Sequence, residues 1–393
     1  MPALKDLDLK DKTVFLRVDL NVPLDKEQNI TNDARIQAAL PTLQFLLEKK
    51  AYVITASHLG RPGGKIVPEL SLKPVAQRLQ ELIPQKVVFA QDVIGEDSTR
   101  LKKELQPGEV LLLENLRFHN EEKENNKEFS QKLAEGIDVY VNDAFGTCHR
   151  AHASVVGIPR HVSQKAAGFL VEKEVDYLKR LVSPEKPYTA ILGGAKVSDK
   201  IPVITNLLDK ADDILIGGAM AYTFFAAQGM PTGLSLVEED KLELALDLLG
   251  KAQRLGVGFN LPVDHLTAEK MEPFAPTEIQ FGFPIPAQRL ALDIGPETVR
   301  HYSEIIARAK TIFWNGPMGV FEIDQFSQGT RKIAEAVAES SALSVVGGGD
   351  SVAALYKAGV QEHISHISTG GGASLEFVAN ESLPGLEALN TSE

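Results

Sequence analysis

A stretch near the middle of the chain combines glycines and lysines in a way that suits a phosphate group. Gly193 and Gly194 follow a short apolar run, and Lys196 and Lys200 come next, one helical turn apart. Glycine allows close backbone approach to an anion, and Ser198 is placed to cap a helix whose first N–H groups would face that anion. The alternative is a tight strand-to-helix turn with solvated lysines, since the Walker pattern GxxxxGK[ST] is absent.

Basic side chains follow the strand-like runs of the N-terminal half. Short apolar runs predict buried parallel strands at residues 14–18, 52–56, 87–90, 110–113 and 139–141. Helical patterns alternate with these runs, which predicts a doubly wound α/β domain that binds its ligand beyond the carboxyl ends of the strands. The basic residues near those ends are Arg17, Arg35, His58, Arg61, Arg117, His149, Arg150 and His152. Their repetition in an acidic chain predicts a pocket for a small, strongly anionic ligand.

Each of these side chains taken alone has a simpler interpretation. A single arginine is usually a surface ion-pair partner, and a single histidine is usually a polar loop residue. No Cys/His spacing resembles a zinc site. Cys148 stands beside His149, but sequence neighbours rarely form a thiolate pair, so nucleophilic catalysis is a poor interpretation.

In the C-terminal half, the strand-like runs end in glycine. The glycines at these ends are Gly193, Gly194, Gly217, Gly218, Gly316, Gly319, Gly347, Gly348, Gly349, Gly370, Gly371 and Gly372. The pattern predicts a second α/β sheet whose ligand edge is bare backbone, which suits a nucleotide. Asp350 is either an Mg²⁺ ligand on a phosphate chain or a helix cap. Glu322 is either a ribose acceptor or an exposed loop acid, and no GxGxxG fingerprint is present.

Length and composition set the broad class. With 393 residues, of which 44% are hydrophobic, two domains are expected. A net charge of −12 argues against a nucleic-acid partner. The single cysteine excludes a disulfide framework and favours a reducing compartment. The first residues lack a signal-peptide layout and no apolar run is long enough for a membrane span, so a cytoplasmic protein without a membrane partner is expected.

An amphipathic pattern at residues 169–182 predicts a helix, and a proline-bounded turn follows it at 183–187. This segment is either a rigid connector between two domains or the last helix of the first domain.

Several long motifs resemble those of the phosphoglycerate kinase family, in that family's order and over nearly the whole chain. They are RVDLNVP at 17–23, SHLGRP at 57–62, ENLRF at 114–118, HRAH at 149–152, GGAKVSDK at 193–200, NGPMGVFE at 315–322 and GGDS at 348–351. The resemblance implies a monomeric glycolytic enzyme with two doubly wound, Rossmann-like α/β domains joined by a helical hinge. Residues 1–168 with 380–393 would bind 3-phosphoglycerate or 1,3-bisphosphoglycerate, 169–185 would form the hinge, and 186–379 would bind Mg-ADP or Mg-ATP.

The resemblance also implies site residues. The substrate set is Asp19, Asn21, Arg35, His58, Leu59, Gly60, Arg61, Arg117 and Arg150. The nucleotide set is Gly193, Gly194, Lys196, Lys200, Gly217, Gly218, Gly316, Glu322, Gly348, Gly349, Asp350 and Ser351, with Asp350 near Mg²⁺.

The implied reaction moves a phosphoryl group between a carboxylate and ADP, and an ionised carboxylate needs no general base. Catalysis then depends on alignment and charge neutralisation, for which we expect Arg35, Lys200 and the backbone at Gly371 and Gly372. Ligands on separate domains require hinge closure, with flexing expected near residues 169–190 and 369–374. A nicotinamide-dependent dehydrogenase and a two-domain metabolite-binding protein are the alternatives. The first lacks its dinucleotide fingerprint, and the second needs no nucleotide site and usually carries an export signal.

Overall fold

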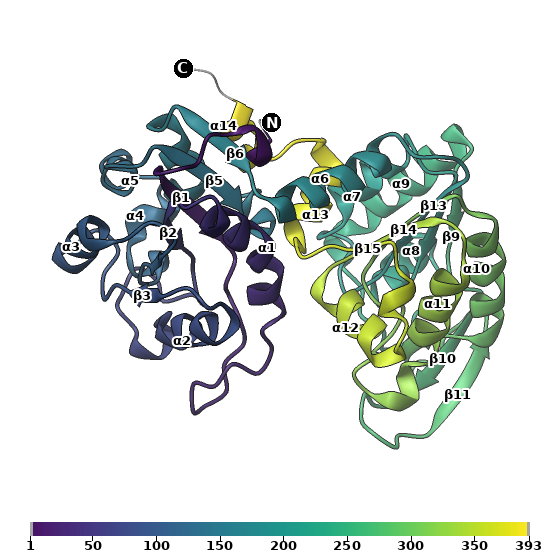
Figure 1. Cartoon of the computed structure of the whole chain (residues 1–393). Coiled ribbons are helices and arrows are strands. Elements are labelled where there is room, and N and C mark those ends of the chain that lie inside the picture. Colours follow the sequence, from purple (N-terminus) through teal and green to yellow (C-terminus); the bar gives the residue numbers. More distant parts are fainter. Residues whose placement is uncertain (1–2, 391–393) are drawn as a thin grey trace. The chain divides into compact units, whose positions relative to one another are not determined.

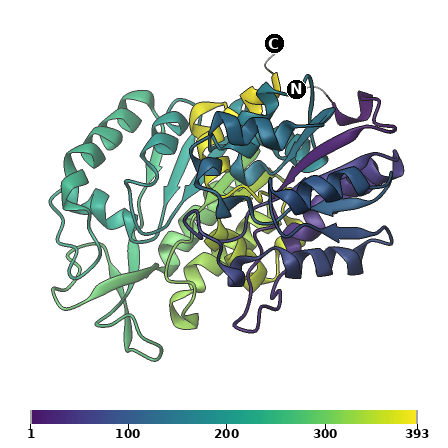
Figure 2. The same ribbon diagram turned by 90° about the vertical axis from the view of Figure 1, so that its left-hand side faces the viewer.

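The computed structural model describes residues 3–390, and the chain divides into two compact units (Figure 1 and Figure 2). Unit 1 contains the residues up to Val175 and those from Ser382 on, and unit 2 is Asp176–Glu381. The first division falls inside one helix, α6 (Phe169–Val182). Residues 1–2 and 391–393, which the sequence assigns to the first domain, lie outside the described residues.

Unit 1 is built on a six-stranded parallel sheet with strand order β3-β4-β2-β1-β5-β6. The strands are β1 (Thr13–Val18), β2 (Tyr52–Ala56), β3 (Val87–Phe89), β4 (Val110–Leu112), β5 (Val139–Asp143) and β6 (Gln164–Ala167). The helices, apart from α6, are α1 (Ala34–Glu48), α2 (Lys73–Leu82), α3 (Glu96–Glu104), α4 (Asn120–Lys123), α5 (Lys127–Ala134) and α14 (Pro384–Asn390). The order reverses between β1 and β5, and such a switch point leaves a crevice at the carboxyl ends of the strands.

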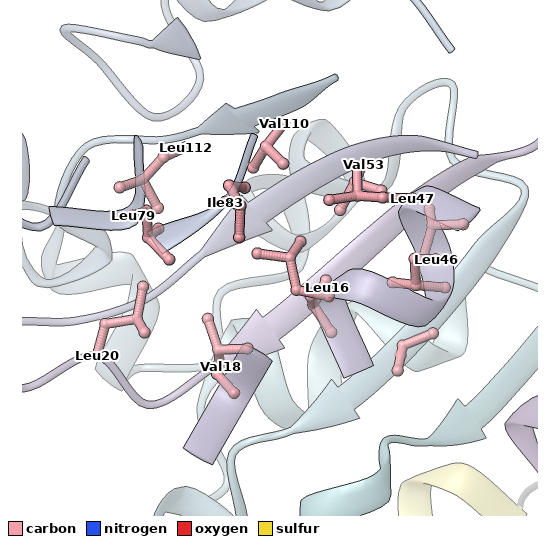
Figure 3. Close-up of a cluster of buried hydrophobic side chains, with 14 of the residues drawn as sticks. Leu16, Val18, Leu20, Leu46, Leu47, Val53, Leu79, Ile83, Val110 and Leu112 are labelled. Carbon is pink, nitrogen blue, oxygen red and sulfur yellow. The ribbon is translucent and has the colours of Figure 1, made fainter. Parts of the chain in front are cut away.

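The core of unit 1 shows why these strands stay in register. Leu16 and Val18 of β1 point to the same face because successive strand residues alternate, and there they meet Leu46 and Leu47 of α1 (Figure 3). Phe15 points to the other face and stacks on Tyr140 of β5. Each fully buried leucine contributes roughly 1.5–3 kcal/mol. A slip of one residue would exchange the two faces, so burial fixes where the chain leaves each strand.

Unit 2 contains a second six-stranded parallel sheet, with order β15-β14-β13-β7-β8-β9. Its strands are β7 (Tyr188–Leu192), β8 (Asp213–Ile216), β9 (Gly258–Asn260), β13 (Thr311–Asn315), β14 (Leu343–Gly347) and β15 (His366–Ile367). Its helices are α7 (Ile201–Leu207), α8 (Met220–Ala227), α9 (Leu242–Leu255), α10 (Pro296–Arg308), α11 (Gln328–Glu339), α12 (Gly349–Ala358) and α13 (Gly372–Asn380). The switch point lies between β7 and β13, two strands that end in glycine-rich loops. None of the helices in residues 3–390 is long and apolar enough to cross a membrane.

Unit 2 also contains a three-stranded antiparallel sheet, which the sequence patterns did not predict. It has the order β11-β10-β12 and consists of β10 (Asp264–Ala268), β11 (Thr277–Phe281) and β12 (Leu290–Ile294), drawn in green (Figure 2). Strand β11 is mostly exposed and mixes polar with apolar residues, so it lacks the continuous apolar run of a buried parallel strand. The prediction of two parallel-sheet α/β domains is confirmed.

The predicted helix start at Ser198 is wrong. Helix α7 begins at Ile201, and Lys200 occupies the position before it. Ser198 donates its hydroxyl and its backbone N–H to the carboxylate of Glu238, at 2.6 and 3.0 Å, so it does not cap a helix. Lys196 therefore lies in the loop between β7 and α7, and the two lysines do not share a helix face.

Several glycines in unit 2 are needed for loops to pack against each other. A Cβ atom at Gly193 would overlap the carbonyl oxygen of Pro317, and one at Gly316 would overlap the carbonyl oxygen of Gly193. Gly316 also has φ of +99°, a backbone conformation that residues other than glycine rarely adopt. The backbone N–H of Gly218 donates to Met318 at 2.8 Å. These contacts join the ends of β7, β8 and β13 into one surface.

We predict that Gly193→Ala destabilises unit 2 by about 1–3 kcal/mol, because the new methyl group overpacks against backbone that cannot rotate away. Trp314 is the only tryptophan and donates its indole N–H to Gly316, so its fluorescence during urea unfolding reports on this edge. The matched control is Gly250→Ala, inside helix α9, where a Cβ meets only the end of Arg254 at 3.3 Å. The control should keep or increase the free energy of unfolding; equal stability of the two variants would contradict the packing argument.

Candidate active site

The predicted site residues of unit 1 follow adjacent strands of the sheet. Asp19 and Asn21 follow β1, His58 follows β2, Arg117 follows β4 and Arg150 follows β5. The sheet order places these four strands side by side, so their carboxyl ends meet at one edge. The switch point between β1 and β5 lies within this set.

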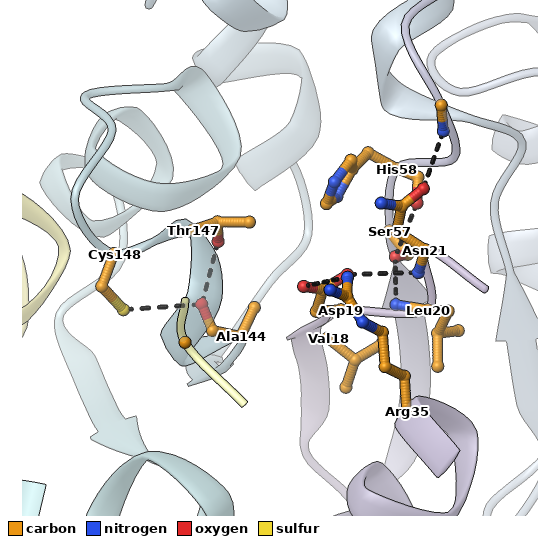
Figure 4. A network of polar contacts seen from close by, with 12 residues as sticks. Val18, Asp19, Leu20, Asn21, Arg35, Ser57, His58, Ala144, Thr147 and Cys148 are labelled. Carbon is orange, nitrogen blue, oxygen red and sulfur yellow. Dashed lines mark hydrogen bonds and ion pairs between the residues drawn. The ribbon is translucent and has the colours of Figure 1, made fainter. Parts of the chain in front are cut away.

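An ion pair and an amide hold the loop after β1. Nη1 of Arg35 lies 3.0 and 2.9 Å from the two carboxylate oxygens of Asp19, while the Arg35 side chain stays 40% exposed (Figure 4). Oδ1 of Asn21 accepts a hydrogen bond from the backbone N–H of Gly60 at 2.8 Å, which ties the β1 and β2 loops together. Arg35 thus has a fixed position and a guanidinium still open to a ligand.

Burial and the neighbouring arginines lower the pKa values of two histidines at this edge. The pKa of His58 is far below its usual 6.5, because of burial first and then the charges of Arg17, Arg117, Arg35 and Arg150. For the same kinds of reason the pKa of His152 falls to about 3, with Arg17, Arg117 and Arg150 as the nearby cations. Both rings are therefore neutral at pH 7. A site in which cations already oppose one another is stabilised by an anion.

The pKa of Arg117 is lowered for similar reasons. Burial, and after it Arg150 and Arg17, lower the pKa of its guanidinium to about 10. Its Nη1 donates to the carbonyl oxygen of Gly60 at 2.7 Å, whereas its Nε is buried without a hydrogen-bond partner in residues 3–390.

Other residues of the predicted substrate set are hydrogen-bonded to neighbouring protein groups or are exposed without a partner in residues 3–390. The backbone of Leu59 is held by the side-chain amide of Asn115, at 3.2 Å for its N–H and 2.7 Å for its carbonyl. Arg150 donates from Nε to His149 at 3.1 Å. Arg61 is exposed, and within residues 3–390 its side chain makes no hydrogen bond or ion pair.

Three residues of this region were not in the predicted site. Arg17 was noted only as a basic residue near a strand end, yet it is buried beside His58. Ser154 and Glu122 are also buried. Ser154 accepts a hydrogen bond from Arg17, and Glu122 is linked to Arg17 through Ser154. A buried serine and a buried glutamate have no local sequence pattern that would reveal them.

Unit 2 contains a cavity of about 690 Å³ at its glycine-rich edge. Of the predicted nucleotide set, Gly194, Gly218, Glu322 and Asp350 line it. The remaining wall is largely apolar and includes Tyr222, Leu234, Leu236, Met271, Leu290 and Leu292. An apolar wall beside bare backbone suits a flat ring with a polar tail. The sequence did not indicate this apolar wall, because part of it comes from the unpredicted antiparallel sheet and the segments next to it.

Lys200 is buried at the same edge. The residue is 9% exposed, and its Nζ donates to Oδ1 of Asn315, the last residue of β13. Burial lowers the pKa of the ammonium from 10.5 to about 8, against the opposing effect of Asp199 and Asp350. Lys196 is exposed, without a side-chain hydrogen bond or ion pair in the described part of the chain. The two lysines thus differ sharply in environment.

Two helices begin at glycines on this edge. Helix α12 starts at Gly349, after Gly348 with φ of +95°, and α13 starts at Gly372, after Gly371 with φ of +49°. A Cβ at Gly349 or Gly371 would meet nothing within 4 Å, so the space in front of these N-termini is open. Free N–H groups there suit phosphate oxygens.

Ser351 serves a different purpose from that of an open ligand group. Its Oγ is buried and accepts a hydrogen bond from the backbone N–H of Gly316 at 2.6 Å. Gly193, Gly217 and Gly316 likewise face protein atoms at close range. These members of the predicted nucleotide set pack against other protein atoms and support the glycine-rich edge.

Asp350 is the predicted ligand of a divalent cation at this edge. Asp350 is exposed and lines the cavity. Among residues 3–390, no group of three His, Cys, Asp or Glu side chains could hold a metal ion by itself. This arrangement fits Mg²⁺, which is commonly held by one or two carboxylates together with substrate phosphates and water.

Comparison with known proteins shows the family of this chain. The family model described as phosphoglycerate kinase matches residues 4–381. The chain is 56% identical over 396 residues to a phosphoglycerate kinase of Koribacter versatilis, covering 98% of each chain. It is 55% identical over 387 residues to one of Anaeromyxobacter sp. strain K, covering 97% of each.

Solved structures give the same result. The phosphoglycerate kinase of Coxiella burnetii superposes with a TM-score of 0.89 at 43% identity, covering 99% of this chain and 98% of the other. That of Pyrococcus horikoshii OT3 gives 0.85 at 38% identity with the same coverage. On the combined sequence and structural evidence, this chain belongs to the phosphoglycerate kinase family.

Proposed function

We propose that this protein transfers a phosphoryl group reversibly between 1,3-bisphosphoglycerate and ADP, giving 3-phosphoglycerate and ATP, as a step of glycolysis. The observation that carries the proposal is the presence, in one chain of this family, of an arginine cluster on one parallel sheet and a nucleotide-sized cavity on another. The first suits a small polyanion and the second suits a base with a phosphate chain.

Unit 1 is the proposed substrate domain. A phosphate and a carboxylate together carry enough negative charge to relieve the repulsion among the arginines. The residues assigned to this ligand are Asp19, Asn21, Arg35, His58, Arg61, Arg117 and Arg150, together with the backbone of Leu59 and Gly60. Arg35 is assigned a second role at the reacting phosphoryl group, because its guanidinium is the more exposed partner of its ion pair with Asp19.

Unit 2 is the proposed nucleotide domain. The apolar wall would take the base, Glu322 the ribose, and the open N-termini at Gly349 and Gly372 the phosphates. Lys200 would meet the transferring phosphoryl group, since it is the buried cation of this edge. Asp350 would hold Mg²⁺, which supplies positive charge to the phosphate chain.

The proposed chemistry is direct, in-line transfer. A carboxylate oxygen of 3-phosphoglycerate forms a bond to the γ-phosphorus of ATP, and the bond from that phosphorus to the bridging oxygen breaks with its electron pair leaving on ADP. No proton moves, because the attacking carboxylate is already ionised. The residues therefore act by alignment and by neutralising charge on the phosphoryl oxygens.

Direct transfer requires the two ligands to be in contact at the moment of reaction. Since they are assigned to different units, we propose that the units close on each other around the helix Phe169–Val182, which the boundary between them crosses, and around residues 369–374. We also propose that the enzyme works as a monomer, because each assigned ligand site consists of residues from one unit of a single chain. We propose a cytoplasmic location because the single cysteine favours a reducing compartment.

A coupled assay that follows ATP formation from 1,3-bisphosphoglycerate and ADP tests the function and the catalytic residues together. Wild-type protein should turn over. Arg35→Ala and Lys200→Ala should each lower kcat by on the order of 10²–10⁴-fold, as loss of charge-stabilising groups does elsewhere. Arg100→Ala and Lys251→Ala remove surface ion-pair partners and should leave kcat within about twofold. No activity in the wild type would refute the function, and near-normal kcat in either site variant would refute its catalytic role.

The pKa of Lys200 predicts a pH dependence. In the free enzyme it lies at about 8, so the ammonium loses its charge as pH rises through 8. We expect kcat/KM for ADP to fall by up to about tenfold per pH unit above that point. Arg stays charged throughout this range, so Lys200→Arg should lack the descending limb, whatever its absolute rate. The same inflection in both proteins would show that another group titrates.

Closure of the units predicts a change in small-angle X-ray scattering. The radius of gyration should decrease when 3-phosphoglycerate and the non-hydrolysable analogue of Mg-ATP are both bound, and change less with either alone, because only the ternary complex brings the two ligands together. An unchanged radius in the ternary complex would contradict closure.

A further inference from the structure

We propose that Glu122 is a positioning residue for the anion site of unit 1. Through Ser154 it holds Arg17, and Arg17 in turn holds the ring of His58 with its free N–H available to the substrate. This inference rests on the proposed function, since it takes the ligand of this site to be 3-phosphoglycerate.

Glu122 is an unusual residue for its location. It lies in the short helix α4, its side chain is 1% exposed, and the arginine cluster is nearby. A buried carboxylate is costly unless its oxygens are hydrogen-bonded. Both oxygens of Glu122 accept hydrogen bonds from Ser154: the backbone N–H donates at 2.9 Å and the hydroxyl donates at 2.6 Å. Nδ1 of His152 lies farther away, at 3.8 Å from Oε1.

The hydroxyl group of Ser154 links Glu122 to Arg17 by hydrogen bonds. Because a carboxylate only accepts, the single hydroxyl hydrogen of Ser154 must point at Glu122. The lone pairs of the same oxygen then face Nε of Arg17, which donates at 2.8 Å. The carbonyl oxygen of Ser154 accepts from the hydroxyl of Tyr140 at 2.8 Å, so the serine is fixed on its backbone side as well.

Arg17 links Ser154 to His58. Its Nη1 donates to the carbonyl oxygen of Val18 and its Nη2 lies 3.3 Å from Nδ1 of His58. A guanidinium has no acceptor, so Nδ1 must accept, and the hydrogen of the neutral ring resides on Nε2. His58 lies at the edge that also holds Asp19 and Asn21 (Figure 4). The series of contacts thus ends in one oriented donor for an anionic substrate.

A different role for Glu122 makes the opposite prediction. If its carboxylate served only to offset the arginine charges, its removal would leave the site more positive and would tighten anion binding. If Glu122 positions Arg17 and His58, its removal weakens binding although the site gains net positive charge. The sign of the change therefore separates the two roles.

The test is Glu122→Gln, which keeps the size but replaces one acceptor oxygen with a donor that faces the donors of Ser154. By titration calorimetry, we expect the dissociation constant for 3-phosphoglycerate to rise about tenfold or more, because hydrogen bonds to a charged group are lost, and the dissociation constant for ADP to stay unchanged. The matched control is Glu121→Gln, the preceding and largely exposed glutamate, which should behave as wild type. Tighter or unchanged binding of 3-phosphoglycerate by Glu122→Gln would overturn the proposal.

A second measurement reports on the ring itself. Nitrogen-15 spectra of histidine-labelled protein distinguish the two neutral tautomers, and the His58 signals are assigned with His58→Gln. Wild type should show His58 protonated at Nε2, and Glu122→Gln should show a mixture of tautomers. An unchanged pure tautomer in Glu122→Gln would show that Glu122 does not act through Arg17 on His58, and would also overturn the proposal.

Ser154→Ala covers the case in which Glu122→Gln does not fold. It leaves every charge in place and removes only the bridging hydroxyl, so the same selective loss of 3-phosphoglycerate affinity is expected. Where both variants fold, their effects should be non-additive because they break one series of contacts; additive effects would refute the series.

Arg117→Ala separates this inference from the proposed function. If it retains wild-type affinity for 3-phosphoglycerate, the ligand assignment itself fails, whereas loss of binding there with no effect of Glu122→Gln refutes only the role of Glu122.

Discussion

Like charges share the carboxyl edge of the unit 1 sheet, and the fold has to hold them there. Arg17, Arg117 and Arg150 each depress the pKa of His58 and of His152, so these groups lie within one another's fields. Buried strands hold these arginines together despite their repulsion, because the alternating faces of the strands fix the register. An anionic ligand relieves this repulsion, which makes the site selective for negative charge before any individual contact is considered.

Unit 2 meets a related requirement with backbone in place of charged side chains. Gly193 and Gly316 let the loops after β7 and β13 pack in direct contact, and Gly349 and Gly371 leave two helix N-termini open. Lys200 is a buried cation at this edge, and its ammonium donates a hydrogen bond to Asn315. The surface thus offers backbone N–H donors and a buried ammonium, an arrangement suited to neutralising the charge on phosphoryl oxygens.

Some of this was accessible from sequence because it depends on local patterns. Apolar β-branched runs predict buried parallel strands wherever they occur, and the residues that follow them necessarily lie at the ligand edge. His58 and Arg117 were predicted on that basis together with the family motifs. The antiparallel sheet β10–β12 was missed because β11 has no buried face of its own, and with it part of the apolar wall of the cavity.

By itself, the sequence determined the two parallel-sheet domains, their basic and glycine-rich edges and the family. Those features depend on residue type and on short-range periodicity, which a linear chain displays. The tertiary structure decided what each residue does at its edge. It placed Lys200 before helix α7 with a lowered pKa. It also brought Ser154 against Arg17 across 137 positions of separation, and against Glu122 across 32. Burial and hydrogen bonding between distant segments set such roles, and no local pattern encodes them.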